Sequence, residues 1–324
     1  MTLQQPSTPC RISIIDATLR EGAQTPGVSF TVEDSAEIAA AVAAIGVGMI
    51  ECGHPAAGED QRDRIAAARA ATDLPILAHA RARRGDVRAA ADAGAAWVGI
   101  FIGVNEVSRR ARLSRRVAQD PTRHLVEAIS EAKDLGLAAR FTVEDASRTS
   151  APELIDAFGA AIDAGADRIC WADTVGVRAP AEVADATRLL RRTFADTPLE
   201  LHLHDDRGLA LANALAGAEA GADWIAATVN GVGERCGIVD TLQLLINLRL
   251  QGMTSNDPDG EAIAAARDIV ARATGMPISP QRALTGEHAF THTSALHRQA
   301  MQRDGATYEA INPDWLGARP KGRE

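Results

Sequence analysis

The sequence predicts an α/β protein, a (β/α)8 TIM barrel with a short helical C-terminal appendage, on three observations. Eight short apolar runs lie between residues 11 and 231, in the order RISIID, MIECG, PILAHA, WVGIFIG, ARFTVED, RICWADT, LELHLHD and WIAATVNG. Ala-rich segments with helical period separate the runs and end in Gly-containing turns such as KDLGLA (133–138). Strands that alternate with helices indicate a parallel sheet, and eight such units favour a closed barrel over an open sheet.

The turn after the first run argues against a doubly wound nucleotide-binding sheet. It reads DATLREGAQ (16–24), whereas that fold places a Gly-rich phosphate turn there. The Gly-rich stretch NGVGERCG (230–237) follows the eighth run instead, and its glycines do not have the G-x-G-x-x-G spacing. A dinucleotide site is therefore excluded.

The alternation of apolar runs and helical segments ends near residue 254. A polar linker, TSNDPDGE, precedes one more helical stretch and a polar segment that carries three of the eight histidines. We therefore expect a catalytic barrel over residues 1–253 and a helical C-terminal subdomain over residues 254–324 that completes the active site.

Composition limits the class of protein. Lys and Arg number 34 against 43 Asp and Glu, a net charge of −9, while hydrophobic residues make up 46% and aromatic residues 3%. Such a chain can bury a large core, which we expect to be aliphatic, with a barrel interior filled by Val, Ile, Leu and Ala. The acidic balance gives no support for nucleic-acid binding, and neither a membrane-spanning run nor a signal-peptide pattern is present, so we expect a cytoplasmic protein. Cys52 and Cys170 lie in apolar runs and are expected to be buried thiols.

The strongest local signal is LHLHDD (201–206). Side chains alternate along a strand, so His202 and His204 point the same way, which is inward in a barrel strand. Two imidazoles on one inward face need partners, and a shared metal is the simplest, although a hydrogen-bonded pair of core histidines is the alternative. The turn after the first strand offers Asp16 or Glu21 as a third ligand, or else a plain ion pair of Arg20 with Asp16.

Six motifs, in order along the chain, resemble the homocitrate synthase and isopropylmalate synthase family, the DRE-TIM metallolyases. They are IIDATLREGAQTPG, GMIECGHP, RFTVEDASR, WADTVG, HLHDDRGLALANALAGAEAGADW and NGVGERCGI. The resemblance implies an acyltransferase that condenses acetyl-CoA with a 2-oxo acid in a metal-assisted Claisen reaction and then hydrolyses the thioester. The implied cofactor is a divalent metal (Zn, Mn, Mg, Fe or Co), and acetyl-CoA is the co-substrate.

The resemblance also implies roles at the metal. Glu21, His202 and His204 match the metal ligands, and Arg20 matches the residue that stabilises the oxyanion at the 2-oxo carbonyl. Asp16 is expected to support the site without touching the metal.

Further residues match positions around the substrates. Gln24 and Thr174 are implied to contact the 2-oxo acid, and Glu144 is implied to take part in acid–base catalysis. The stretches FTHTSALHRQA and TYEAINP place His297 and Tyr308 on the family's catalytic His and Tyr. In the family these two residues reach the active site of the neighbouring subunit, which implies a homodimer.

Two positions bear on the substrate. Ile238 in GERCGI favours the homocitrate branch, and Arg83 stands where that branch has a His that touches the distal carboxylate. An Arg there suits an anionic far end, so 2-oxoglutarate, oxaloacetate and phosphonopyruvate stay open. The run RRARLSRR (109–116) is either a solvated face or a region that attracts anionic substrates. A hydroxymethylglutaryl-CoA-lyase-type reaction and a non-catalytic binding protein are the rival functions.

Overall fold

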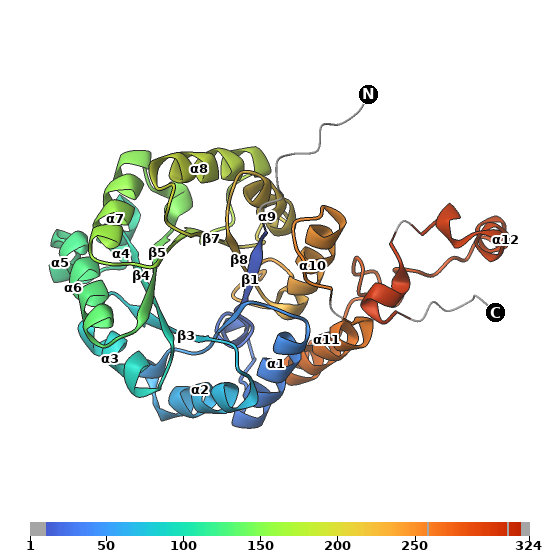
Figure 1. Ribbon diagram of the computed structural model, residues 1–324, viewed down its shortest axis with the longest axis horizontal. Helices are drawn as coiled ribbons and strands as arrows, with labels where there is room; N and C mark the ends of the chain where they lie inside the picture. The colour runs from blue at the N-terminus through green and yellow to red at the C-terminus, as the bar shows by residue number, and fades with distance from the viewer. Residues whose placement is uncertain (1–10, 258, 310, 319–324) are drawn as a thin grey trace.

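Eight parallel strands close into a barrel in the computed structural model, which describes residues 11–257, 259–309 and 311–318 (Figure 1). Strand β1 pairs with β2 on one side and with β8 on the other, and each remaining strand pairs with its neighbours in sequence. The strands are β1 (Ser13–Asp16), β2 (Met49–Glu51), β3 (Ile76–Arg81), β4 (Trp97–Gly103), β5 (Ala138–Glu144), β6 (Arg168–Asp173), β7 (Leu199–Leu203) and β8 (Trp224–Ala227). The eight apolar runs of the sequence are these strands, so the predicted fold class is confirmed.

Helices follow the strands and form the outer ring (Figure 1). They are α1 (Val32–Ala44), α2 (Glu59–Ala71), α3 (Arg84–Asp92), α4 (Glu106–Ala111), α5 (Arg115–Gln119), α6 (Pro121–Asp134), α7 (Ala151–Asp163), α8 (Pro180–Thr193), α9 (Ala210–Glu219) and α10 (Thr241–Leu250). Their ends have local causes. Thr31 and Asp34 form a capping box at the start of α1, and Gly136, with φ 74°, supplies the left-handed turn after α6.

Strand β7 shows how the pleat selects the inward side chains. Leu201 points outward, where it contacts α9 so closely that a Cβ added at Gly217 would lie 2.1 Å from its Cδ1. Glu200 and His202 therefore face the barrel interior. The outer layer between the strands and the helices is apolar. Cys52 and Cys170 are both buried, as predicted, and Cys10 lies outside the described residues.

The barrel interior differs from the aliphatic filling that composition predicts. A small apolar layer (Ile15, Met49, Leu77 and Ala226) is present. The remaining centre, however, holds the buried charged side chains Glu51, Arg140, Arg168 and Glu200. The expectation of an entirely aliphatic interior was wrong, because composition counts residue types and not the face of the strand on which they lie.

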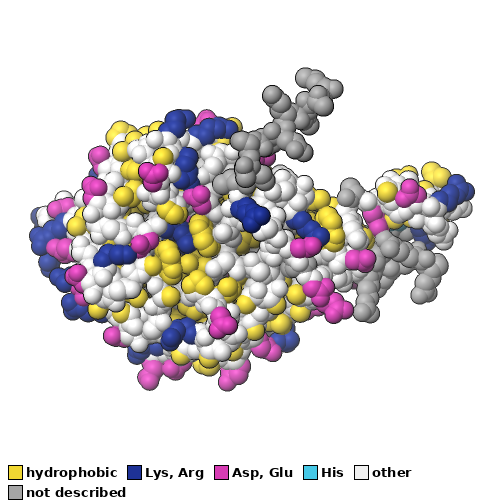
Figure 2. Space-filling model, in the orientation of Figure 1, with side chains coloured by type: hydrophobic (Ala, Val, Ile, Leu, Met, Phe, Trp, Pro, Cys, Tyr) yellow, Lys and Arg dark blue, Asp and Glu magenta, His cyan; other side chains and the backbone are white. Residues whose placement is uncertain are grey.

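The C-terminal segment begins against the barrel and then leaves it. Helix α11 (Gly260–Thr274) buries Ile263 and pairs with α1 through Arg272 and Glu37. Helix α12 (Ala295–Arg303) lies at the far end of an arm that extends away from the barrel (Figures 1 and 2). Among the described residues, no helix is both long and apolar enough to cross a membrane.

Candidate active site

A cavity of about 650 Å³ opens at the carboxyl ends of the strands, the end at which TIM barrels place their active sites. Strand ends and the loops after β1 and β8 contribute its walls. The polar lining residues are Arg20, Glu21, Gln24, His54, Gln61, His79, Arg112, Arg140, Thr142, Glu144, Thr174, His202, His204, Glu234 and Arg235.

Three buried residues at one side of this cavity form a candidate metal site. Ligand atoms of Glu21, His202 and His204 all lie within 4.8 Å of one another. His202 Nε2 is 3.8 Å from a Glu21 carboxylate oxygen, and the two imidazole centres are 5.2 Å apart. His204 Nδ1 is buried without a hydrogen-bond partner in the described part of the chain, as expected of an atom that has a metal as its partner. Two imidazoles and a carboxylate suit a divalent metal, so the residues present fit the ion that the family uses.

The protonation states in this cluster also suit metal binding. Burial and the nearby Arg20 hold the pKa of His202 well below its usual value, and burial lowers the pKa of His204. Burial alone would raise the pKa of Glu21, but Arg20 and the two imidazoles outweigh it and lower the pKa to about 2. At neutral pH the cluster is therefore one carboxylate and two neutral imidazoles, the forms that ligate metals.

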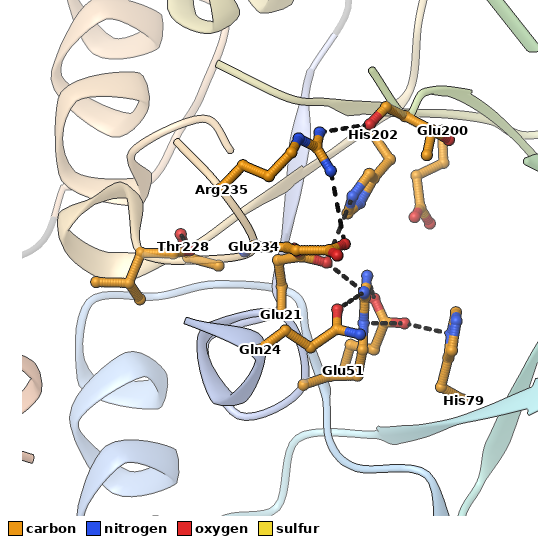
Figure 3. Close-up of polar contacts among 12 residues, drawn as sticks. Glu21, Gln24, Glu51, His79, Glu200, His202, Thr228, Glu234 and Arg235 are labelled. Atoms are coloured by element: carbon orange, nitrogen blue, oxygen red, sulfur yellow. Dashed lines mark hydrogen bonds and ion pairs between the residues drawn. The ribbon is translucent and has the colours of Figure 1, made fainter. Parts of the chain in front are cut away.

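Arg20 is held in place by three acceptor side chains, those of Glu21, Gln24 and Glu51, which Figure 3 shows close together. Its Nε donates to Glu51 Oε1 at 3.1 Å and its Nη1 donates to Gln24 Oε1 at 3.2 Å, while Nη1 also pairs with Glu21. Glu21 is fixed in turn, because the backbone N–H of Glu234 donates to its Oε1 at 3.0 Å. The turn after β1 and the loop after β8 thus set the position of the guanidinium beside the metal site.

A buried chain of charges runs from Arg20 through the barrel centre. Glu51 accepts from Arg140 Nη2 at 3.1 Å, and Arg140 Nη1 donates to Glu200 at 2.7 Å. Glu200 also accepts from Arg168 at 3.1 Å. The Arg168 guanidinium carbon lies 3.8 Å from the Trp224 ring centre and 4.7 Å from that of Trp97.

Glu144 and Thr174, which the resemblance assigns to the active site, both line the cavity. Glu144 pairs with Arg112, which reaches in from the loop between α4 and α5. Thr174 Oγ1 accepts from the backbone N–H of Asp145 at 2.8 Å, and Asp145 has a left-handed backbone with φ 57°. Of the arginine run, Arg112 is the member that lines this cavity, while Arg109 pairs with Glu153 at 3.2 Å.

Arg83 lies apart from the residues of the large cavity. It lines a second cavity of about 110 Å³, which shares Phe101, Arg112 and Glu144 with the first. The two cavities are therefore neighbours with Arg112 and Glu144 in their common wall. Figure 2 shows further Lys and Arg side chains at the edge of the molecule where Figure 1 places α5 and α6.

His297 and Tyr308 lie on the C-terminal arm and do not line the cavity of their own chain. Their rings stack at 4.1 Å, and Tyr308 is 43% exposed. Asp16 also lies outside the cavity, where its carboxylate accepts from Thr18 N–H and the Thr241 hydroxyl.

Sequence reasoning missed several residues of the site. Glu51, Arg140 and Glu200 each stand inside an apolar strand, and a charge within such a run was the signal available. His54 lies in the turn after β2, at the end of the barrel from which such folds supply catalytic groups.

Comparisons with known proteins agree with this geometry. A family model described as HMGL-like matches residues 11–270, and a model described as homocitrate synthase post-HMGL domain-like matches residues 284–322. The probable 2-isopropylmalate synthase of Methanopyrus kandleri is 37% identical over 319 residues, which cover 96% of this chain and 62% of that protein. The homocitrate synthase of Saccharolobus islandicus is 38% identical over 313 residues, which cover 95% of this chain and 67% of that protein.

A solved structure shows the same fold. The HMG-CoA lyase of Bacillus subtilis has a TM-score of 0.71 at 21% identity, over 85% of this chain and 97% of that chain. The chain spans 62% to 67% of the length of the two synthases. On the extent of these matches, the chain belongs to the HMGL-like family, in the group that contains the homocitrate and 2-isopropylmalate synthases.

Proposed function

We propose that this chain condenses acetyl-CoA with an anionic 2-oxo acid and then hydrolyses the thioester, as a homocitrate synthase-like acyltransferase. One observation carries the proposal. Glu21, His202 and His204 cluster beside Arg20 in the main cavity of a barrel whose relatives are named as synthases of this kind. In the reaction, the acetyl methyl carbon bonds to C2 of the 2-oxo acid, and water then releases CoA.

The cavity residues have different roles in the proposed reaction. A divalent metal held by Glu21, His202 and His204 would act as a Lewis acid toward the 2-oxo acid. Arg20 is fixed beside these ligands, so its guanidinium can stabilise negative charge that develops at the keto oxygen. Gln24 lines the same wall and can donate to the substrate carboxylate. Zn, Mn, Fe, Co and Mg all accept such a ligand set, and metal analysis of the purified protein distinguishes them.

The far end of the 2-oxo acid is proposed to be anionic. Arg83 and Arg112 line the second cavity, whose volume of about 110 Å³ is sufficient for a small charged group. A planar guanidinium binds carboxylate and phosphonate oxygens in pairs. 2-Oxoglutarate is the first candidate, and phosphonopyruvate, which would give 2-phosphonomethylmalate, is the second.

The arm is proposed to complete the site of a neighbouring subunit in a homodimer. His297 and Tyr308 stack together on the arm but lie outside the cavity of their own chain. We accordingly divide the chain into a catalytic barrel, residues 1–253, and a C-terminal subdomain, residues 254–324, that supplies acid–base groups together with Glu144.

Thiol release from acetyl-CoA tests the function. The metal-loaded enzyme is assayed against 2-oxoglutarate, oxaloacetate, phosphonopyruvate and 2-oxoisovalerate, and the apolar end of the last serves as the matched control. We expect turnover with an anionic 2-oxo acid and little with 2-oxoisovalerate. Cleavage of 3-hydroxy-3-methylglutaryl-CoA without thiol release from any mixture would instead identify a lyase.

A further inference from the structure

Arg112 is shared by the two neighbouring cavities. Among the described arginines it alone lines both, and its Nη1 pairs with Glu144 in their common wall. The Arg112 guanidinium carbon lies 5.7 Å from the ring centre of Phe101, within the range of a cation–π contact. Phe101 also lines both cavities, and its ring stacks on His79 at 4.4 Å. The guanidinium thus lies over a supported ring and has a carboxylate of the common wall as its partner.

The second cavity contains one uncommitted guanidinium and one that already has a partner. Arg81 donates to Asp86 at 2.6 Å and 3.0 Å, so its charge is already compensated. Arg83 has no acidic partner in the part of the chain that the structure describes. Glu144 is the one acidic side chain among the described residues of the lining, and it pairs with Arg112. An anion that enters beside Arg83 therefore competes with Glu144 for Arg112.

The segment that carries Arg112 allows a change of partner. Helices α4 and α5, which flank it, have six and five residues, and Ser108 is the buried residue of the two. Because few buried contacts hold this segment, the side chain of Arg112 can turn at a small cost in free energy. Two anions beside one guanidinium repel each other, so a second anion weakens the pair of Arg112 with Glu144.

The pairing with Arg112 also limits what Glu144 can do. A carboxylate beside a guanidinium keeps its charge more firmly and accepts a proton less readily. Glu144 belongs to the proposed acid–base groups, and 17% of its side chain is exposed, so solvent screens this ion pair only in part. Departure of Arg112 would therefore make Glu144 a stronger base.

We propose that Arg112 determines specificity by changing partners: it neutralises Glu144 in the free enzyme and binds the anionic far end of the 2-oxo acid in the complex, which frees Glu144 for proton transfer. This inference rests on the proposed function. No covalent bond changes when the partners are exchanged. An apolar far end offers Arg112 no new partner, so Glu144 stays paired and acetyl-CoA keeps its methyl protons. Recognition of an anionic 2-oxo acid is thereby coupled to proton transfer.

Steady-state kinetics of Arg112→Gln test the specificity. The metal-loaded enzyme is assayed by thiol release with the best anionic 2-oxo acid of the panel and with 2-oxoisovalerate. We expect KM for the anionic substrate to rise about 10- to 100-fold, the loss typical of a hydrogen bond between charged groups. The kcat value should be nearly retained, since Glu144 is unpaired in the variant, and kcat/KM for 2-oxoisovalerate should not fall. A merely structural role would lower kcat/KM for both substrates together.

Exchange of the acetyl methyl protons tests the release of Glu144. Acetyl-CoA is incubated in heavy water with the metal-loaded enzyme, and NMR spectroscopy follows the loss of methyl protons. The probes are glutarate and 3-phosphonopropionate, which have a methylene group in place of the keto group of 2-oxoglutarate and phosphonopyruvate. The wild type should exchange about tenfold faster with the matching probe than without it. Arg112→Gln should show the faster exchange without any probe, and Glu144→Gln in the same background should abolish it.

Arg110→Gln is the matched control, since Arg110 belongs to the same arginine run, is 72% exposed and lines neither cavity. It should retain the wild-type KM, kcat and exchange rate. Arg112→Lys keeps the charge but loses the planar fork, so it should give an intermediate KM. An unchanged ratio of kcat/KM between the two 2-oxo acids in Arg112→Gln, or wild-type exchange that neither probe accelerates, overturns the proposal and leaves the proposed function standing. A wild-type enzyme that releases no thiol from any mixture overturns both.

Discussion

Burial decides the charge of most ionisable residues near the site. It keeps the imidazoles of His79, His202 and His204 neutral. The carboxylates of Glu21 and Glu51 stay ionised despite burial, because Arg20 lowers the pKa of Glu21, and Arg140 and Arg20 lower the pKa of Glu51. The result is a set of neutral nitrogen ligands beside fixed anions, without any ligand having to lose a proton when a metal binds at neutral pH.

His202→Ala tests the metal site directly. Removal of one of two imidazoles leaves two ligands, so we expect the purified variant to contain little divalent metal and to show no turnover. Metal analysis by mass spectrometry and the thiol-release assay measure the two losses together. His124→Ala, on α6, removes an imidazole outside the cavity and should retain both metal and activity. Full activity in metal-free His202→Ala would contradict the site.

Asp16→Asn tests a buried carboxyl group outside the cavity. Burial raises the pKa of Asp16 from 3.8 to about 6, despite hydrogen bonds from Thr18 and Thr241. The folded state thus binds this proton more tightly than the unfolded state. The protonated Asp16 carboxyl group therefore contributes its full share of the unfolding free energy below pH 3.8, and this contribution is lost as the pH rises to about 6.

The difference in unfolding free energy between the wild type and Asp16→Asn reports on the Asp16 carboxyl group alone, since Asn does not titrate and all other groups titrate in both proteins. Relative to the wild type, Asp16→Asn should gain about 2 kcal/mol in unfolding free energy between pH 4.5 and pH 7. Urea unfolding at the two pH values measures the difference. A constant difference would mean that Asp16 has an ordinary pKa in the folded protein.

At the scale of elements, the strands place alternate side chains in two different environments. The outward residues of β7 pack on helices, whereas Glu200 and His202 face a centre in which charges pair with one another. Three guanidiniums (Arg20, Arg140 and Arg168) share two carboxylates there. The charge of each member is compensated only while its partners remain in place.

Glu200→Gln should therefore be costly. The substitution removes the counter-charge of the buried Arg168 and one of the two counter-charges of the buried Arg140. Breaking such a buried ion pair typically costs about 3–5 kcal/mol of unfolding free energy. Denaturant unfolding measures the loss. Asp185→Asn is the matched control, because its partner Arg188 is exposed and such surface pairs contribute about 1 kcal/mol or less. Equal effects of the two substitutions would refute the claim that the interior network stabilises the barrel.

Much of the fold could be predicted from the sequence because strands and helices leave periodic patterns. The eight apolar runs and the Gly turns sufficed for the barrel, and the spacing of His202 and His204 sufficed to place both on one face. The pairing of Glu51 with Arg140 could not be predicted, since it joins β2 to β5 across the interior and depends on strand stagger that no local pattern records. The contact of His54 with Asp86 likewise joins the turn after β2 to the first turn of α3, and α2 and β3 lie between these two segments in the chain.

At the scale of the whole molecule, the arm separates its aromatic pair from the cavity of its own chain. Helix α11 and the short helix Pro313–Leu316 tie both ends of the arm to the barrel, since Ile263 and Leu316 are buried in the same core. The segment between them, with His297 and Tyr308, extends outward (Figure 1). Such an arm is well placed to act on a second copy of the chain.

Subunit mixing tests this assembly. His202→Ala and His297→Ala should each be inactive alone, because one lacks a proposed metal ligand and the other lacks the proposed acid–base group of the arm. If the arm works on the neighbouring subunit of a two-fold dimer, random mixed dimers hold one intact site each, so about a quarter of the sites should recover activity. Recovery should be absent if each arm serves its own barrel. An unmixed sample of each variant at the same total concentration is the control.

The stacked ring of Tyr308 has a practical consequence. It is the single tyrosine of the chain, and it lies exposed on the arm against His297. A tyrosine-selective reagent such as tetranitromethane would thus label one site per chain, and the nitrophenol absorbance would report on the arm alone. A change in this absorbance on addition of acetyl-CoA or a 2-oxo acid to the nitrated protein would provide a stopped-flow signal for the moment at which the arm engages its target.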